Sequence, residues 1–345
     1  MKKLILIILL LPFLFAQPRA MEFTAPQVPE SGREYMDESP ETFGEGLLHI
    51  ISKALPKIQP ALAEAAKACV GVIAAVFVLT IGATFHADTV QRLVGAIVVA
   101  AMLLTPSRSL ISLAADTVKQ LSDYGKLLLP VMASAMAAQG SVTASSALYA
   151  GTAFFNSVLS SIISGLVVPL LYVYICFCVA QAAIGDESLQ KLRDFAKWLM
   201  TWLLKTTLYV FTGYLTITGA VSGSVDAAAM KATKLTISGM VPVVGGILSD
   251  ASETVLVSAG ILKNAAGVYG ALAVLSVCIG PFLQIGAQYL LLKLTHAVCS
   301  AFGAKEPVKL IGDFSGVMGV LLGMTGTVSL LLLVSTVCMI RGGGL

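Results

Sequence analysis

Long apolar runs separated by shorter polar segments dominate the pattern of hydrophobic and polar positions along this chain of 345 residues. Six of these runs reach or approach the roughly 20 residues that an α-helix needs to cross a bilayer. They lie at residues 65–85, 93–105 with some flanking positions, 158–182, 199–221, 266–292 and 315–340. The pattern therefore predicts an all-α fold, a polytopic helical membrane protein with about six transmembrane helices.

The segments between these runs carry apolar residues at roughly helical spacing, interrupted by polar ones. At 46–64 the apolar stripe is broken by Pro56 and Pro60, which favours an amphipathic helix at the membrane interface. Residues 107–126 and 223–265 are also amphipathic, and the second run ends at Pro106. The apolar stretch 127–138 is only 12 residues long. We predict that it forms a re-entrant or interfacial piece, because it is too short to span.

The first residues have the form of a secretory signal, with Lys2 and Lys3 followed by an apolar stretch at 4–15. We predict a signal peptide at 1–20, an extracytoplasmic acidic arm and amphipathic segment at 21–64, and a helical membrane domain at 65–345. The composition of 21–46 predicts a flexible arm. Six spans after a cleaved signal put both chain ends outside the cytoplasm. The Lys and Arg residues of the loops divide evenly between the two sides, so they do not decide the orientation.

Two pairs of prolines are equally spaced, which suggests an internal duplication. Pro130 and Pro169 are 39 residues apart, and so are Pro242 and Pro281. Duplicated halves with proline-broken apolar segments are common in transporters. Chance resemblance within a strongly apolar composition is the alternative. Because proline removes a backbone donor, these four positions are candidate helix breaks that line a cavity.

Composition supports a membrane location and excludes several functions. Hydrophobic residues make up 57% of the chain and charged residues 12%, whereas about 25% of residues are charged in soluble domains. The net charge of +3 is too small to indicate nucleic-acid binding. The six cysteines lie in or beside apolar runs, which favours buried thiols over a disulfide framework. Glycines four residues apart, at 312 and 316 and at 319 and 323, predict close helix packing.

No arrangement of residues in the sequence predicts a chemical reaction. The three histidines are far apart, and no metal-ligand spacing, P-loop or nucleophile motif occurs. We therefore expect no enzyme activity, cofactor or metal. Lys205 is the candidate intramembrane charge, because it lies about two turns into the run 199–221 if that span begins near Lys197. Its long side chain could instead reach back to the interface.

Three long stretches carry a resemblance to a known family. They are SGREYMDESPETFGEGLLHIISKALPKIQPALAEAAK from Ser31, ACVGVIAAVFVLTIG from Ala68, and TGAVSGSVDAAAMKATKLTISGMVPVVGGILSDASETVLVSAGILKNAAGVYG from Thr218. Together with the signal sequence, they resemble the stage III sporulation protein AE family of endospore-forming bacteria over nearly the whole chain. The family has no assigned catalytic residues, so the resemblance transfers none.

The resemblance implies a multi-pass protein of the cell membrane that acts during spore formation, in the mother-cell membrane around the engulfed forespore. The implied partners are the lipid bilayer and the other subunits of a transenvelope complex, which include a secretion-type ATPase and ring-forming proteins. The implied role is a channel component, a permease-like or export-gate subunit. The alternative is a scaffold that only anchors the other subunits. A channel predicts that polar side chains near the paired prolines converge on a cavity, whereas a scaffold predicts dry packing.

Overall fold

A computed structural model describes residues 26–36, 42–82, 88–139, 141–240, 245–301 and 305–341, with the backbone alone at 88–89, 91, 216, 218–240, 245–263 and 341. Its elements are α2 (Glu30–Arg33), α3 (Phe43–Gly82), α4 (Asp88–Ala138), α5 (Val142–Ile162), the π-helical η1 (Ile163–Val167), α6 (Val168–Ile184), α7 (Glu187–Met240), α8 (Gly245–Ser300) and α9 (Lys305–Arg341). These ranges contain helices and no strand, which confirms the predicted all-α fold. The predicted signal peptide at 1–20 lies outside the described residues, and the domain boundaries stay predictions.

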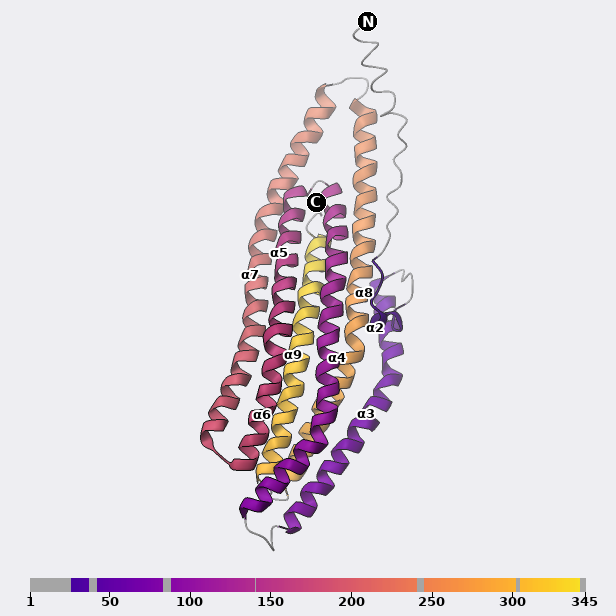
Figure 1. The fold of residues 1–345 in the computed structure, drawn as a ribbon. Coiled ribbons are helices and arrows are strands. Elements are labelled where there is room, and N and C mark those ends of the chain that lie inside the picture. Colours follow the sequence, from indigo (N-terminus) through magenta and orange to yellow (C-terminus); the bar gives the residue numbers. More distant parts are fainter. Residues whose placement is uncertain are drawn as a thin grey trace.

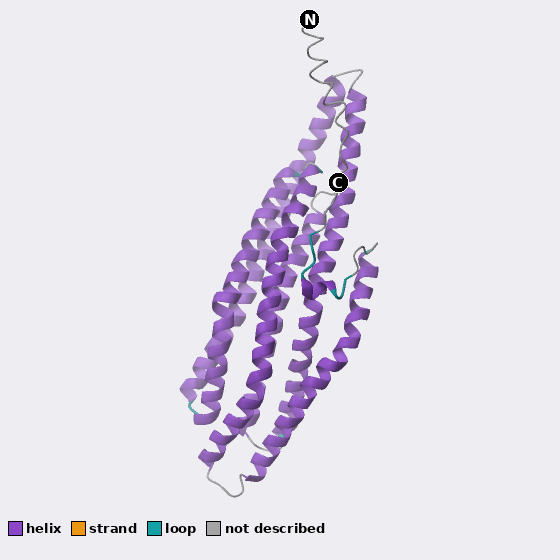
Figure 2. Ribbon diagram, turned by 45° about the vertical axis from the view of Figure 1, so that its right-hand side comes forward, coloured by secondary structure: helices purple, strands orange, loops and turns teal. Residues whose placement is uncertain are grey.

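The long helices run alternately up and down and form an elongated bundle (Figures 1 and 2). We call the end at which α6 turns into α7 the Gly185 end, where α3 and α8 also end and α4 and α9 begin. The opposite end, where α4 turns into α5, we call the Ser141 end. The central helix is α9, which packs against α4, α5, α6, α7 and α8, whereas α3 lies on the outside against α8 and α4.

Glycines in α9 permit the close packing of this central helix. A Cβ on Gly312 would lie 3.1 Å from the ring of His296 in α8, and one on Gly319 would lie 3.6 Å from Tyr289 of the same helix. The large side chain of Phe314, two residues after Gly312, is buried. These contacts are the close helix packing that the glycine spacing predicts.

Five helical stretches within the described residues are long and apolar enough to cross a bilayer. They are Phe43–Gly82, Arg92–Ala138, Val142–Ile184, Asn264–Ser300 and Lys305–Ile340. Five of the six predicted runs fall largely within these stretches. The sixth, 199–221, lies in α7, which is not among the five. The predicted count of about six spans is therefore only an approximation.

Two predicted interruptions are wrong, because the helices continue through their prolines. The short span, amphipathic segment and re-entrant piece expected over 93–138 form the single helix α4, which contains Pro106 and Pro130. In the same way, α3 continues through Pro56 and Pro60 and joins the expected interfacial segment to the first span. Each proline removes only one backbone donor, and the packing of a long helix against its neighbours outweighs that local loss.

The segment 26–36, which we expected to be part of a flexible arm, is folded against the bundle. Ser31 Oγ donates a hydrogen bond to Gln120 Oε1 of α4 at 2.6 Å. A Cβ on Gly32 would lie 2.5 Å from Ser276 Oγ of α8, so α2 approaches α8 very closely. The apolar side chains that the segment buries are those of Val28, Tyr35 and Met36. Its composition is polar, but these few side chains and a glycine contact are enough to dock it.

The two halves suggested by the proline spacing have the same outline. One half runs up along α4 and down along α5 and α6, and α6 contains Pro169 (Figure 1). The other half runs up along α7 and down along α8, which contains Pro281. Pro130 lies inside α4, whereas Pro242 lies outside the described residues. The duplication therefore stays a prediction.

Candidate functional site

A tight turn between α6 and α7 positions the polar side chains of the Gly185 end. Gly185 has a φ of 78°, in the left-handed region that glycine adopts at little cost, and its N–H donates to the Gln181 carbonyl at 2.8 Å. The Asp186 carboxylate then accepts a hydrogen bond from the Ser188 N–H at 2.7 Å and caps the first turn of α7. A Cβ at position 185 would lie 2.8 Å from Arg92 Nη1 of α4. The turn therefore fixes the start of α7 against α6 and α4.

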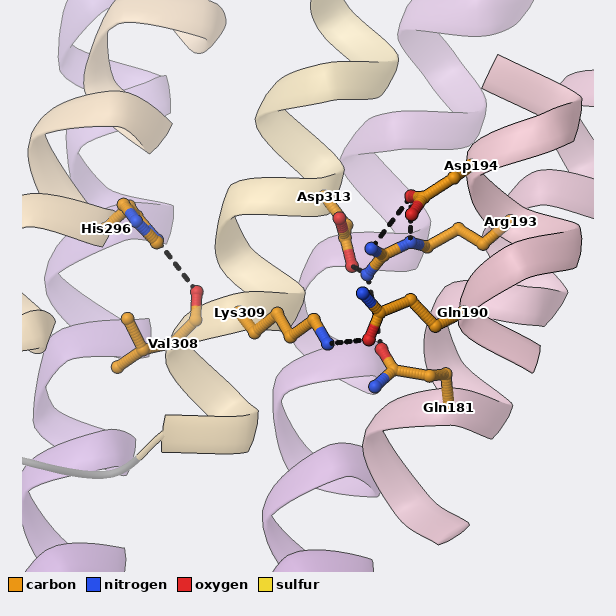
Figure 3. A network of polar contacts seen from close by, with 8 residues as sticks. All are labelled: Gln181, Gln190, Arg193, Asp194, His296, Val308, Lys309 and Asp313. Carbon is orange, nitrogen blue, oxygen red and sulfur yellow. Dashed lines mark hydrogen bonds and ion pairs between the residues drawn. The ribbon is translucent and has the colours of Figure 1, made fainter. Parts of the chain in front are cut away.

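Arg193, in the second turn of α7, is a buried arginine paired with the central helix (Figure 3). Its Nη1 donates to Asp313 Oδ2 at 2.8 Å and to Gln181 Oε1 at 3.2 Å. Its Nε and Nη2 donate to Asp194 Oδ1 at 3.1 and 2.9 Å. The Arg193 and Asp313 side chains are only 8% and 14% exposed. One guanidinium therefore joins α6, α7 and α9 through charge-assisted hydrogen bonds.

Two further polar contacts lie beside this ion pair. Lys309 Nζ donates to Gln190 Oε1 at 3.0 Å and so links α9 to α7 a second time. On the other side of α9, His296 Nδ1 of α8 lies 2.9 Å from the Val308 carbonyl (Figure 3). Together with the ion pair, these separate contacts join α6, α7, α8 and α9 at the Gly185 end.

The charge state of Arg193 follows from its surroundings. Burial lowers the pKa of the guanidinium, but the carboxylates of Asp313 and Asp194 raise that pKa by more, so it ends above the ordinary value. Arg193 therefore stays charged. Because Arg193 and Asp313 are both largely removed from water, each depends on the other to offset its loss of hydration.

This arrangement suits the joining of helices. Among the described residues, no group of three or more His, Cys, Asp or Glu side chains could hold a metal ion. An ion pair buried between two helices fixes their relative position, and it separates only when both charges find water or new partners. The network can therefore hold the Gly185 end together, or release it if a partner supplies other charges.

The cavity that the four proline positions were predicted to line stays a prediction, and three of these prolines lie in described helices. Pro130 lies on the exposed face of α4 and Pro169 on the exposed face of α6, whereas Pro281 is buried within α8. Pro242 lies outside the described residues. Pro169 is the second residue of α6, just after the π-helical η1, where the wider turn relieves the contact between a proline ring and the preceding carbonyls.

Lys205 has an exposed side chain on α7. It lies about three turns beyond Arg193 on the same helix, and unlike Arg193 it is not buried. Its position on the outside of the bundle fits a lysine that reaches along the helix to an interface. Its role in function stays a prediction.

Sequence reasoning missed the ion pair of Arg193 and Asp313. Both residues fall in segments that the hydropathy pattern predicts as loops, at 183–198 and 293–314. No periodic pattern relates two residues that are 120 positions apart. The only signal that could have found them is that each lies within a turn or two of an apolar run, where a charge needs a partner.

The fold and this network define a multi-pass helical membrane protein whose helices are joined at one end by buried charges. Residues 30–343 match the sequence profile described as stage III sporulation protein AE, and the chain belongs to that family. It is similar to the stage III sporulation protein AE of Bacillus subtilis strain 168, with 19% identity over 264 residues. This match covers 76% of the present chain and 66% of the relative, just under two thirds of its length. No solved structure matches the chain.

Proposed function

We propose that this protein is a membrane subunit of the channel complex that links mother cell and forespore during endospore formation. Its place would be the mother-cell membrane around the forespore. The family supports a role in sporulation, and the apolar helices support a multi-pass membrane protein. The rest of the proposal rests on the length of the helices, which is compared with the thickness of a bilayer in the next paragraph.

The helices are much longer than a membrane is thick. With 51 residues in α4 and 56 in α8, and a rise of 1.5 Å per residue, they are about 77 and 84 Å long, whereas the hydrocarbon core is about 30 Å thick. Stretches without charged residues occur at 68–82, 93–107, 127–185, 206–225, 264–292 and 314–340. The remaining helix length must project from the membrane. A projecting bundle suits a subunit that meets partners in the space between two membranes.

The Gly185 end is the natural candidate for the cytoplasmic side. The predicted exported arm would put the start of α3 outside the cytoplasm, and α3 ends at the Gly185 end, where short connections also join α6 to α7 and α8 to α9. A secretion-type ATPase in the cytoplasm would meet this end, and ring-forming proteins would meet the projecting Ser141 end. The proposed role is permease-like or that of an export gate, and it involves no chemical reaction by this chain.

One observation favours the scaffold as a second candidate. The described core of the bundle contains many apolar side chains with no exposure, including Leu121, Met132, Leu272 and Leu321. Such packing fits the dry interior that a scaffold predicts.

Deletion and complementation in the spore-forming host test the proposal. We expect the deletion strain to stop after engulfment and the restored gene to recover spore yield. A fluorescent fusion should mark the membrane around the forespore, and a tagged protein should copurify with the ATPase and the ring-forming proteins. Normal spore yield without the gene would contradict the proposal. So would a fusion found only in the mother-cell membrane at the periphery of the cell, away from the forespore.

A further inference from the structure

An intrinsically weak turn lies within α8, at Gly280 and Pro281. Glycine and proline are the two least favourable residues inside a helix. Pro281 also has no N–H to donate to the carbonyl of Val277, four residues earlier. The helix nevertheless continues through this turn to Ser300. The groups that pack around the turn therefore matter to its stability.

The central helix α9 packs on one face of this turn. Cys278 Sγ lies 2.7 Å from Ser329 Oγ of α9. The Phe282 ring lies 3.3 Å from the place where a Cβ on Gly326 of α9 would stand. Positions 278 and 282 are one turn apart on the same face of α8. These contacts with α9 therefore support the turn from one side.

The N-terminal segment 26–36 packs on the other face. A Cβ on Gly32 of α2 would lie 2.5 Å from Ser276 Oγ and 2.8 Å from a methyl group of Val277. The Tyr35 hydroxyl lies 3.0 Å from the place where a Cβ on Gly280 would stand. At 3.6 residues per turn, these three positions of α8 lie opposite to its contacts with α9. The segment thus covers the same turn from the other side.

A few contacts outside α8 hold the segment in place. Ser31 Oγ donates to Gln120 Oε1 of α4 at 2.6 Å. Lys57 of α3 forms an ion pair with Glu34, and its Nζ lies 4.6 Å from the centre of the Tyr35 ring. The Lys57 and Glu34 side chains are 40% and 66% exposed, so their ion pair contributes little. These ties to α3 and α4 can be removed without changing α8.

We propose that segment 26–36 is a brace that keeps α8 straight at Gly280 and Pro281, and that its undocking frees this turn to bend. With the segment docked, the turn is held from two sides, by α9 and by α2. Undocking removes the contacts on one side and leaves a turn that lacks one backbone hydrogen bond. Docking of the segment thus controls the flexibility of α8. This brace goes beyond the proposed channel role and does not depend on it.

Hydrogen exchange, measured by mass spectrometry on the full chain in detergent, tests the brace. Ser31→Ala with Lys57→Ala removes the ties to α4 and α3 and changes no residue of α8. The two contacts together are worth about ten-fold in the docking equilibrium, so exchange in segment 26–36 should rise about ten-fold. Because the turn opens only when the segment is undocked, exchange at 277–285 should rise by the same factor. Faster exchange in the segment with unchanged exchange at 277–285 would overturn the proposal.

A matched control removes the same kinds of contact elsewhere on α4. Ser112→Ala with Lys126→Ala deletes a hydrogen bond to Asp116 at 3.4 Å and an exposed ion pair with Asp123. Exchange should stay unchanged in both regions, and acceleration at 277–285 equal to that of the first variant would contradict the brace. If the first variant leaves the segment docked, Gly32→Val releases it by collision with α8. A segment that stays protected in both variants would also overturn the proposal, because these contacts would not be what holds it.

Pro281→Ala tests why the turn needs a brace. Alanine restores the N–H that can bond to the Val277 carbonyl. In this background, Ser31→Ala with Lys57→Ala should still free the segment, but exchange at 277–285 should rise by less than about two-fold. A rise of about ten-fold there would show that the proline is not what the segment supports. None of these readouts uses spore formation, so a failed brace leaves the sporulation role standing, and failure of that role leaves the brace unchanged.

Discussion

Arg193 and Asp313 are 120 residues apart in the chain, yet Arg193 Nη1 donates to Asp313 Oδ2 at 2.8 Å with both side chains largely buried. The contact ties α7 to the central helix α9 next to the α6–α7 turn. Because α9 packs against five other helices, a shift of α7 relative to α9 would change the packing of the helices at the Gly185 end.

Replacing Arg193 with alanine should destabilise the protein strongly. The change leaves the buried Asp313 carboxylate without its cation, which typically costs about 3–5 kcal/mol. Thermal unfolding of the detergent-solubilised protein would measure the loss. Lys126→Ala is the matched control, since its exposed pair with Asp123 should contribute only about 0–1 kcal/mol. Equal small losses for the two variants would show that Asp313 does not depend on Arg193.

The double variant with Arg193→Ala and Asp313→Ala should lose less stability than the sum of the two single variants. Removing both charges leaves neither one buried and unpaired, so the two effects are coupled. The same unfolding measurement on all four proteins gives the coupling energy. Strict additivity would mean that the two groups do not interact in the membrane protein.

Gly151→Ala should disturb the contact between α5 and α7. The ring of Tyr214 occupies the place where the new Cβ would lie, and its hydroxyl donates to the Ala147 carbonyl at 2.8 Å. Forcing the ring aside should cost about 1–3 kcal/mol of stability, as overpacking usually does. At Gly213 a Cβ would meet nothing within 4 Å, so Gly213→Ala should be neutral or stabilising. Equal effects of the two substitutions would rule out the close Gly151–Tyr214 packing.

Gly32→Val should release the N-terminal segment from α8. The added side chain would collide with Ser276 and Val277, whose atoms lie 2.5 and 2.8 Å from the Cβ position. Limited trypsin digestion should then cut at Arg33 faster than in the parent protein. Gly44→Val has no neighbour within 4 Å of its Cβ and serves as the control. Unchanged cleavage at Arg33 would mean that the segment is not docked through Gly32.

Hydropathy predicted the all-α membrane fold because spans depend on local composition, which the sequence displays directly. It failed at Pro130, where a proline on the exposed face of α4 is tolerated within a long packed helix. It also failed at Tyr35, whose burial against the bundle depends on a distant surface that no local pattern reveals. The pairing of Arg193 with Asp313 was beyond prediction for the same reason, since only the tertiary fold brings them together.

Replacing Pro169 and Pro281 together with alanine tests whether these helix positions matter for transport. Restoring a backbone donor at each site should stiffen α6 and α8. We expect the variant to insert and copurify with its partners while spore formation fails after engulfment. Pro56→Ala, at an exposed position of α3 outside the two proline pairs, is the control and should sporulate normally. Normal spore yield from the double variant at a normal protein level would favour the scaffold role.

The orientation of the bundle is the central claim, and accessibility in intact cells tests it most directly. Cysteines are placed at Thr42, next to the start of α3, and at Glu187, in the α6–α7 turn region of the Gly185 end; both positions are exposed. With the native cysteines replaced and the protein expressed in the cell membrane of growing cells, an impermeant maleimide should label Thr42→Cys in intact cells and Glu187→Cys only after the membrane is opened. Labelling of Glu187→Cys in intact cells, or protection of Thr42→Cys, would contradict a bundle that crosses the membrane with its Gly185 end in the cytoplasm.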